Sequence, residues 1–258
     1  MSALPRRPSA LELVPFIAVG VGYSLVGYLR PLFVLPERVV SCGLRKLDLT
    51  LFNVAGHTLG ETLSSRTSPI IDLLCAIPYT VFLYWVFVYA GWLFFRDRRR
   101  SLVFGWAFAI ANCLAFVCWL ALPAAPPWYL HAHGCVVDPS TPSNPAGLLR
   151  VDALLHIHYF RDFYARAATP FGAMPSLHCA YPMIGLLSAW RSATGCARLA
   201  HAAYALLMAY AALYLDHHWL VDVLAGWVTA LVAVTIARHA FEASQNPASR
   251  RKRCSTAE

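Results

Sequence analysis

Residues 69–95, PIIDLLCAIPYTVFLYWVFVYAGWLFF, decide the fold class of this chain. From Ile70 to Phe95 the only charged side chain is Asp72. A helix of ~20 residues crosses the hydrocarbon core of a bilayer, so this run is long enough to span it. The whole chain agrees, with 59% hydrophobic residues, 13% charged residues and a mean hydropathy of +0.53. The sequence therefore predicts an integral membrane protein.

Five further apolar runs extend this prediction to about six membrane-spanning helices. They lie near residues 11–34, 101–121, 174–191, 199–215 and 218–237. The first run continues to Leu29, which favours a retained anchor over a cleaved signal peptide. Because no internal repeat or low-complexity linker divides the chain, residues 1–258 are predicted to form a single all-α integral membrane domain.

Arginine clusters predict how the chain crosses the membrane. They lie outside the proposed spans, at Arg6-Arg7, within residues 96–100, at Arg191 and Arg198, and within residues 250–253. If the amino terminus is cytoplasmic, six crossings place all of them inside, as basic residues prefer. Residues 239–258 then form a disordered, basic cytoplasmic tail. Four basic residues would instead lie on the non-cytoplasmic side of the membrane, namely Arg38, Arg45, Lys46 and Arg66. The net charge of +8 is interpreted as a topology signal and not as nucleic-acid binding.

Two polar segments are predicted to lie on the outer side. Residues 122–173 contain seven prolines, and a loop of this length usually carries function, so we expect it to bear substrate motifs. Within residues 36–66, leucines recur at helical spacing, which fits either an amphipathic helix at the interface or an ordinary loop with a short helix. Cys42 and Cys135 lie in these two segments and can pair, although the sequence does not decide this.

Two short motifs carry the candidate chemistry. They are Pro175-Ser176-Leu177-His178 and His218-Trp219-Leu220-Val221-Asp222. In the predicted topology, the first motif opens the fourth span and the second opens the sixth, both at the outer surface. Two motifs far apart in sequence are therefore expected to meet at one membrane depth and form one active site at the non-cytoplasmic face.

The residue types in these motifs suit phosphoryl transfer. His218 and Asp222 are four residues apart and share one face of a helix, so the carboxylate can accept the Nδ1 hydrogen and leave Nε2 free to attack phosphorus. Ser176 can start a helix whose free N–H groups bind phosphate, with its hydroxyl as a further donor. His178 can protonate the departing alcohol and later deprotonate the incoming one. His217 has the wrong spacing to Asp222 and is interpreted as structural.

The remaining candidates are cations and possible metal ligands in the outer loop. A phosphoryl site needs cations for its non-reacting oxygens, and the loop offers Arg150, Arg161 and Arg166. A metal alternative uses the histidines at 131, 133, 156 and 158 with Asp138 and Asp152. Histidines spaced by one residue suit a strand better than a helix and match no established zinc pattern, so no metal and no cofactor are expected.

These residues resemble a known family. The two motifs are similar to the second and third signatures of the type 2 phosphatidic acid phosphatase superfamily. Leu122-Pro123-Ala124-Ala125-Pro126-Pro127-Trp128-Tyr129 and Phe171-Gly172-Ala173-Met174 resemble its inositol phosphorylceramide synthase branch. Residues 144–147 and 150–152 are compatible with that branch, which adds Asp152 to the substrate-binding candidates Ser176, Arg150, Arg161 and Arg166.

The resemblance implies a six-helix membrane fold and a function. It implies that His178, His218 and Asp222 are catalytic and that phosphoinositol passes from phosphatidylinositol to ceramide through a phosphohistidine, releasing diacylglycerol. The chain departs from the phosphatases of the superfamily, because Ala211-Ala212 replace their Ser-Arg pair and their first signature is not recognisable. The site is expected to face a periplasm or a Golgi-like lumen.

Two rival functions stay open at this point. One is a lipid phosphate phosphatase of the same superfamily, in which water replaces ceramide. The other is a non-enzymatic membrane protein that keeps the fold. The residues also leave open the head group, the acceptor lipid, the phosphate-binding arginine and the oligomeric state.

Overall fold

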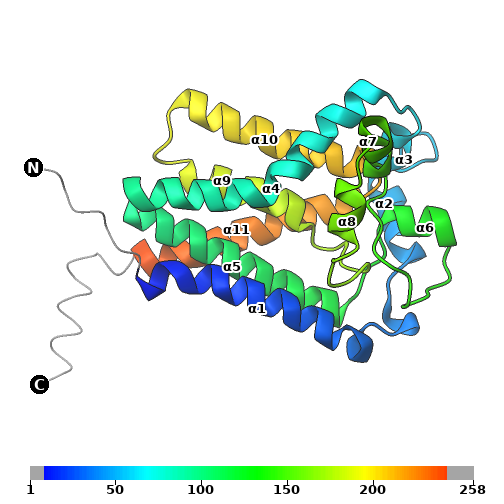
Figure 1. The fold of residues 1–258 in the computed structure, drawn as a ribbon, viewed down its shortest axis with the longest axis horizontal. Coiled ribbons are helices and arrows are strands. Elements are labelled where there is room, and N and C mark those ends of the chain that lie inside the picture. Colours follow the sequence, from blue (N-terminus) through cyan, green and yellow to red (C-terminus); the bar gives the residue numbers. More distant parts are fainter. Residues whose placement is uncertain (1–8, 243–258) are drawn as a thin grey trace, which may run out of the picture.

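The computed structural model describes residues 9–242, and its regular secondary structure there is helical apart from three isolated β-bridges (Figure 1). The elements are α1 (Ala10–Phe33), η1 (Pro36–Arg38), α2 (Cys42–Phe52), α3 (Leu59–Ser64), α4 (Pro69–Arg96), α5 (Arg98–Ala121), α6 (Pro127–His133), α7 (Leu148–Leu155), α8 (Tyr159–Tyr164), α9 (Leu177–Ala189), α10 (Gly195–Tyr214) and α11 (Leu220–Glu242). The all-α prediction is confirmed.

Within the described residues, five helices are long and apolar enough to cross a membrane: α1, α4, α5, α10 and α11. The fourth predicted span, residues 174–191, corresponds to α9, which has 13 residues, fewer than the ~20 that a straight crossing needs. Helix α9 begins late because the Ser176 hydroxyl caps it, and it ends at a turn before α10. Helix α11 continues to Glu242, so residues 239–242 are helical and not tail. Residues 243–258 and Arg6-Arg7 lie outside the described part of the chain.

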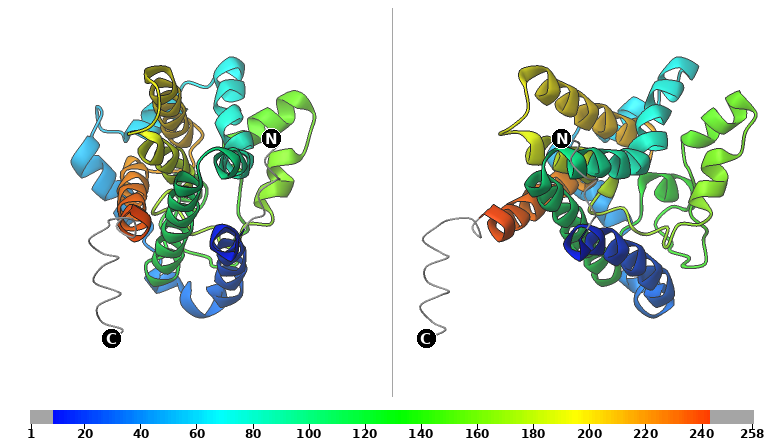
Figure 2. Two further views of the ribbon diagram at one scale, coloured as in Figure 1. Left: turned by 90° about the vertical axis from the view of Figure 1, so that its left-hand side faces the viewer. Right: turned by 60° about the vertical axis from the view of Figure 1, so that its left-hand side comes forward.

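The long helices lie side by side, and α2, α3, α6, α7 and α8 gather at one end of the bundle (Figures 1 and 2). We call this end the site end. Helix α5 packs against α1 and α11, and α9 packs against α10 and α11. Alanines line these contacts, including Ala107 and Ala111 on α5 and Ala230 and Ala233 on α11, all fully buried. Small side chains let helices approach closely, which is how helices associate in lipid.

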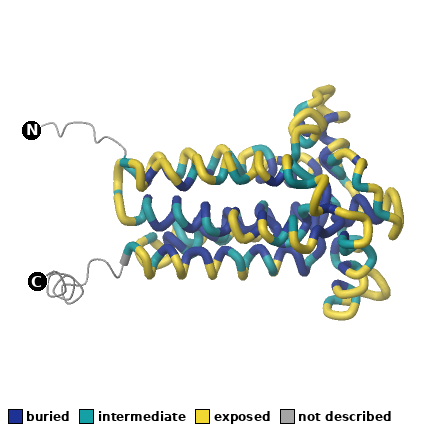
Figure 3. The backbone as a smooth tube through the Cα atoms, turned by 90° about the horizontal axis from the view of Figure 1, so that it is seen from below, coloured by how far each residue is buried: buried dark blue, intermediate teal, exposed yellow. Residues whose placement is uncertain are grey.

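The outer surface of the bundle is apolar, as a membrane environment requires. Exposed residues follow the outward faces of the long helices (Figure 3), and they include Val88, Val117 and Leu199, each at least 66% exposed. Water does not favour so large an apolar surface, whereas lipid does. The described arginine clusters lie opposite the site end. Residues 96–100 span the junction of α4 with α5, Arg191 follows α9, and Arg198 lies in the first turn of α10.

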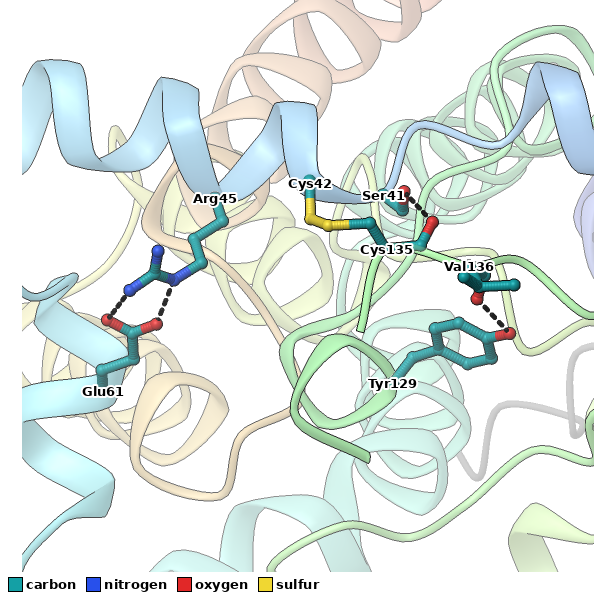
Figure 4. Close-up of a disulfide and its surroundings, with 7 residues drawn as sticks. All are labelled: Ser41, Cys42, Arg45, Glu61, Tyr129, Cys135 and Val136. Carbon is teal, nitrogen blue, oxygen red and sulfur yellow. Dashed lines mark hydrogen bonds and ion pairs between the residues drawn. A yellow bond between two sulfur atoms is a disulfide. The ribbon is translucent and has the colours of Figure 1, made fainter. Parts of the chain in front are cut away.

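The site end is tied together covalently and by charge (Figure 4). Cys42 at the start of α2 forms a disulfide with Cys135, which follows α6. Arg45 on α2 pairs with Glu61 on α3. Two alternatives were open for residues 36–66, an amphipathic helix at the interface or a loop with one short helix. The structure has two short α-helices there, α2 and α3. Helix α2 buries Leu44 against the bundle and leaves Leu47 and Leu51 exposed.

Candidate active site

The two motifs converge at the site end, as the predicted topology requires. His178 lies in the first turn of α9, and His218 lies just before α11. His178 Nδ1 and His218 Nε2 are 3.2 Å apart. Ser176 is the N-cap of α9, where its hydroxyl accepts the N–H of Cys179. The two histidines therefore face each other directly, with a helix amino terminus beside them.

Asp222 is fully buried behind His218. Its Oδ2 lies 3.6 Å from His218 Nδ1, which is an ion-pair separation and longer than a hydrogen bond. The same oxygen accepts the backbone N–H of Trp219 at 2.9 Å. Among the described residues, His218 Nδ1 and Asp222 Oδ1 have no hydrogen-bond partner. Because α11 begins at Leu220, His218 precedes the helix, so the pair does not share a helix face as predicted, and its hydrogen bond is not closed in this conformation.

The backbones of the two motifs are in direct contact. The N–H of Ser176 donates to the carbonyl oxygen of Asp222 at 3.1 Å. A Cβ atom at Gly226 would lie 2.3 Å from the carbonyl oxygen of Ser176, so only glycine allows α11 to approach the start of α9 this closely. This contact sets the distance between the two histidines.

The wall behind the histidines was not predicted from the sequence. The Tyr164 hydroxyl lies 3.4 Å from His178 Nε2. The ring of Tyr79 packs between His178 and His217, with centroid distances of 4.6 and 4.9 Å. Burial, with the nearby His218, lowers the pKa of His217 to about 3. His217 is therefore neutral, and its Nε2–H donates to the carbonyl of Pro145 at 2.9 Å. It ties the outer loop to the site, which fits the structural role expected for it.

A cavity of about 520 Å³ opens onto His178, His217 and His218. From the histidines an apolar arm runs between α1, α4 and α5, lined by residues that include Phe16, Val19, Phe82, Phe87 and Phe108. Along α5 the lining extends from Trp119 to Phe108, which is about 16 Å at 1.5 Å per residue. The opposite end is a polar rim formed by the loops around residues 143 and 169. The cavity thus joins a polar compartment to a lipid-like one at the histidines.

The three candidate arginines occupy different environments. Arg150 forms a bidentate ion pair with Asp72 of α4 and does not line the cavity. The Arg161 side chain is exposed, with Asp162 at 3.9 Å. Arg166 lines the cavity together with the histidines. Asp152, the remaining candidate, is buried and accepts the backbone N–H groups of Phe160 and Arg161, so it holds the start of α8.

The possible metal ligands of the outer loop are dispersed. Within residues 9–242, no group of three or more His, Cys, Asp or Glu side chains is arranged to hold a metal ion. His131 instead bonds to Asp216 at 2.8 Å and approaches Glu61 at 3.5 Å. The hydrogen bond to Asp216 raises the pKa of His131.

Comparisons with known proteins identify the family of the chain. The family described as the PAP2 superfamily matches residues 44–236. The chain is 31% identical to a phosphoinositol dihydroceramide synthase of Bacteroides thetaiotaomicron, over 90% of this chain and 77% of that protein. It is 30% identical to an inositol phosphorylceramide synthase of Candida albicans, over 72% of this chain and 40% of that protein. It is also 30% identical to the catalytic subunit of the Schizosaccharomyces pombe synthase, over 73% and 46%. No solved structure matches the chain.

Proposed function

This chain belongs to the PAP2 superfamily, and from that premise we propose that it is a sphingolipid head-group transferase that moves phosphoinositol from phosphatidylinositol to ceramide or dihydroceramide. The observation that carries the proposal is the pair of facing histidines at the junction of a polar rim and an apolar arm. A phospholipid placed here has its head group in the rim, its phosphorus at the histidines and a chain in the arm.

The first chemical step forms a phosphohistidine. His218 Nε2 attacks phosphorus as the bond from phosphorus to the glycerol oxygen breaks, and His178 gives its proton to that oxygen. Diacylglycerol leaves, and the inositol phosphate stays on His218. Positive charge builds on the His218 ring during attack, and the buried carboxylate 3.6 Å away stabilises it.

The second step reverses the roles. His178 takes the proton of the primary hydroxyl of ceramide, whose oxygen attacks phosphorus as the bond to His218 breaks. Both enzyme groups return to their starting state, and no metal enters the scheme.

Arg166 is our choice for the cation that holds the non-reacting phosphate oxygens. It lines the cavity, whereas the charge of Arg150 is already compensated by Asp72. Arginine suits this role because its planar group binds phosphate oxygens bidentately. Ser176, as the N-cap of α9, presents the helix start to the same phosphate.

We place the site on the non-cytoplasmic face, a periplasm or a Golgi-like lumen. The disulfide at the site end supports this side, because disulfides form in oxidising compartments. The arginine clusters at the opposite end support a cytoplasmic position for that end.

The test uses the purified full-length chain in detergent with phosphatidylinositol labelled in the head group, with and without ceramide. We expect labelled inositol phosphorylceramide only when ceramide is present, and an acid-labile phosphohistidine that His218→Ala abolishes. His239→Ala is the matched control, since His239 is exposed near the far end of the same helix. Release of inositol phosphate without ceramide dependence shows that water is the acceptor and contradicts the transferase proposal. Unchanged lipid turnover in His178→Ala and His218→Ala contradicts both enzymatic readings.

A further inference from the structure

The polar rim of the cavity consists of hydrogen-bond donors. Two loops supply Ser143, Asn144, Arg166 and Thr169, and the end of α5 supplies Trp119. No Asp or Glu of the described residues lines the cavity. A ligand at this rim therefore meets donors and one cation, with no carboxylate to balance a positive group.

Two of these side chains use their oxygen to shape their own loop. Asn144 Oδ1 accepts the N–H of Ala146 at 2.7 Å, and Thr169 Oγ1 accepts the N–H of Phe171 at 3.1 Å. Each oxygen thus spends one of its two lone pairs on its own loop, while the amide hydrogens of Asn144 and the hydroxyl hydrogen of Thr169 remain for a ligand.

Two others, Ser143 and Trp119, have buried polar atoms that lack a partner among the described residues. Ser143 Oγ and Trp119 Nε1 are shielded from solvent and make no hydrogen bond among residues 9–242. Trp119 is only 8% exposed, and its indole nitrogen can only donate. Leaving a buried donor unsatisfied costs ~1–3 kcal/mol, so these two groups require an explanation in the native state, and a ligand bound at the rim is one.

The rim is held rigidly. The loop around residue 145 is fixed by the His217 bond to Pro145 and by Gly147 N–H donating to Leu215 at 2.9 Å. A Cβ at Gly172 would lie 3.1 Å from the Trp119 ring and 3.3 Å from Thr169 Cγ2, so these two side chains converge across a gap that only glycine leaves open. A preformed array of donors loses little entropy when it binds.

From this arrangement we infer that Ser143, Thr169 and Trp119, with the amide of Asn144, form a subsite for the hydroxyl groups of a polyol phosphate head group. Hydroxyl oxygens accept from every donor in the array. An ammonium head group brings only donors, and it meets the Arg166 cation without a balancing carboxylate. The inference deepens the proposed function, since it assigns the choice of inositol over amine head groups to these side chains.

The experiment measures binding apart from the reaction. Short-chain phosphatidylinositol, phosphatidylethanolamine and phosphatidylethanol are titrated into the full-length chain in detergent, in a His218→Asn background that cannot form the phosphohistidine. Phosphatidylethanol keeps the phosphodiester and lacks head-group hydroxyls. The variants Ser143→Ala, Thr169→Val and Trp119→Phe each remove a donor. Thr169→Val also removes the acceptor of the Phe171 N–H, and Trp119→Phe also replaces a buried indole with a smaller ring. Matched controls at the opposite end are Ser192→Ala, Thr235→Val and Trp190→Phe.

We expect the unaltered rim to bind phosphatidylinositol at least tenfold more tightly than either other lipid. Each rim variant should weaken phosphatidylinositol about tenfold and change phosphatidylethanol less than threefold, while the controls change neither. If the rim variants lose the same affinity for phosphatidylinositol and for phosphatidylethanol, the subsite is overturned. An unchanged preference for phosphatidylinositol in these variants overturns it as well. If the preference follows the rim but the wild-type chain transfers nothing to ceramide, the subsite stands and the proposed reaction fails.

Discussion

Replacing Gly226 with alanine tests whether the contact between α9 and α11 sets the catalytic geometry. The added methyl carbon would lie 2.3 Å from the carbonyl oxygen of Ser176, and its next neighbours are also backbone atoms of Ser176. The shortest C–H···O contacts in proteins are about 3.3 Å, so the two helices must separate here by about 1 Å. No flexible side chain is available to absorb this movement.

The consequence for activity is larger than that for stability. Overpacking costs ~1–3 kcal/mol, and alanine returns up to ~1 kcal/mol of helix propensity relative to glycine. The separation, however, carries His178 away from His218, whose ring nitrogens are now 3.2 Å apart. A misplacement of ~1 Å at a reacting centre lowers rates about 100-fold. We therefore expect about 1% of wild-type transfer from a protein that remains folded.

The assay is the initial rate of labelled head-group transfer to ceramide, together with the thermal midpoint in the same detergent. Gly91→Ala is the control, because Gly91 lies in the middle of α4 and a Cβ there meets no atom within 4 Å. It should keep full activity. If Gly226→Ala retains more than a third of the wild-type rate, or if its rate falls only in proportion to lost folded protein, the backbone contact does not control the site.

Three further predictions concern the site end. Replacing Cys42 and Cys135 with serine should lower stability by up to ~4 kcal/mol, since the disulfide closes a loop of 93 residues; thermal midpoints with and without reductant measure this. The hydrogen bond that raises the pKa of His131 stabilises the fold fully below the unfolded pKa of ~6.5, and that contribution is lost as pH rises through the folded pKa. In His131→Asn, the thermal midpoint should therefore depend less on pH above ~6.5 than in the wild type. A pH dependence equal to that of the wild type contradicts the assignment. Arg166→Ala should lower phosphohistidine formation about 10- to 100-fold with little loss of stability, whereas Arg150→Ala should mainly lower stability by ~1–3 kcal/mol. Equal effects of the two variants on the rate would refute our choice of Arg166.

The convergence of His178, His218 and Asp222 was predictable because antiparallel spans return every second helix start to the same side. That reasoning needs only the apolar runs and the positions of the motifs. A helix start at Ser176 was expected from the sequence, whereas the length of α9 was not, since an apolar run of 18 residues does not show how many of them are helical. Hydropathy locates a segment, whereas hydrogen bonds at its ends decide how much of it is helical.

The choice among the arginines required the structure. Asp72 compensates Arg150 from 78 residues away, and no local pattern reveals such a pair. Tyr79 and Tyr164 also gave no signal, because aromatic residues make up 13% of the chain and most of them pack against lipid or other helices. The residues that pack against the catalytic candidates can be identified only from the folded structure.

The contact between His178 and His218 has a consequence for how substrate enters. His218 Nε2, the atom proposed to attack phosphorus, now faces His178 Nδ1 at 3.2 Å, so a phosphoryl group must separate the two rings. The backbones cannot provide this movement, because Ser176 is bonded to Asp222 and packed on Gly226. The Tyr79 ring covers one face of His178, which leaves rotation of the His218 side chain. If that rotation also brings His218 Nδ1 within hydrogen-bond distance of Asp222, now 3.6 Å away, entry of the phosphate would activate the nucleophile.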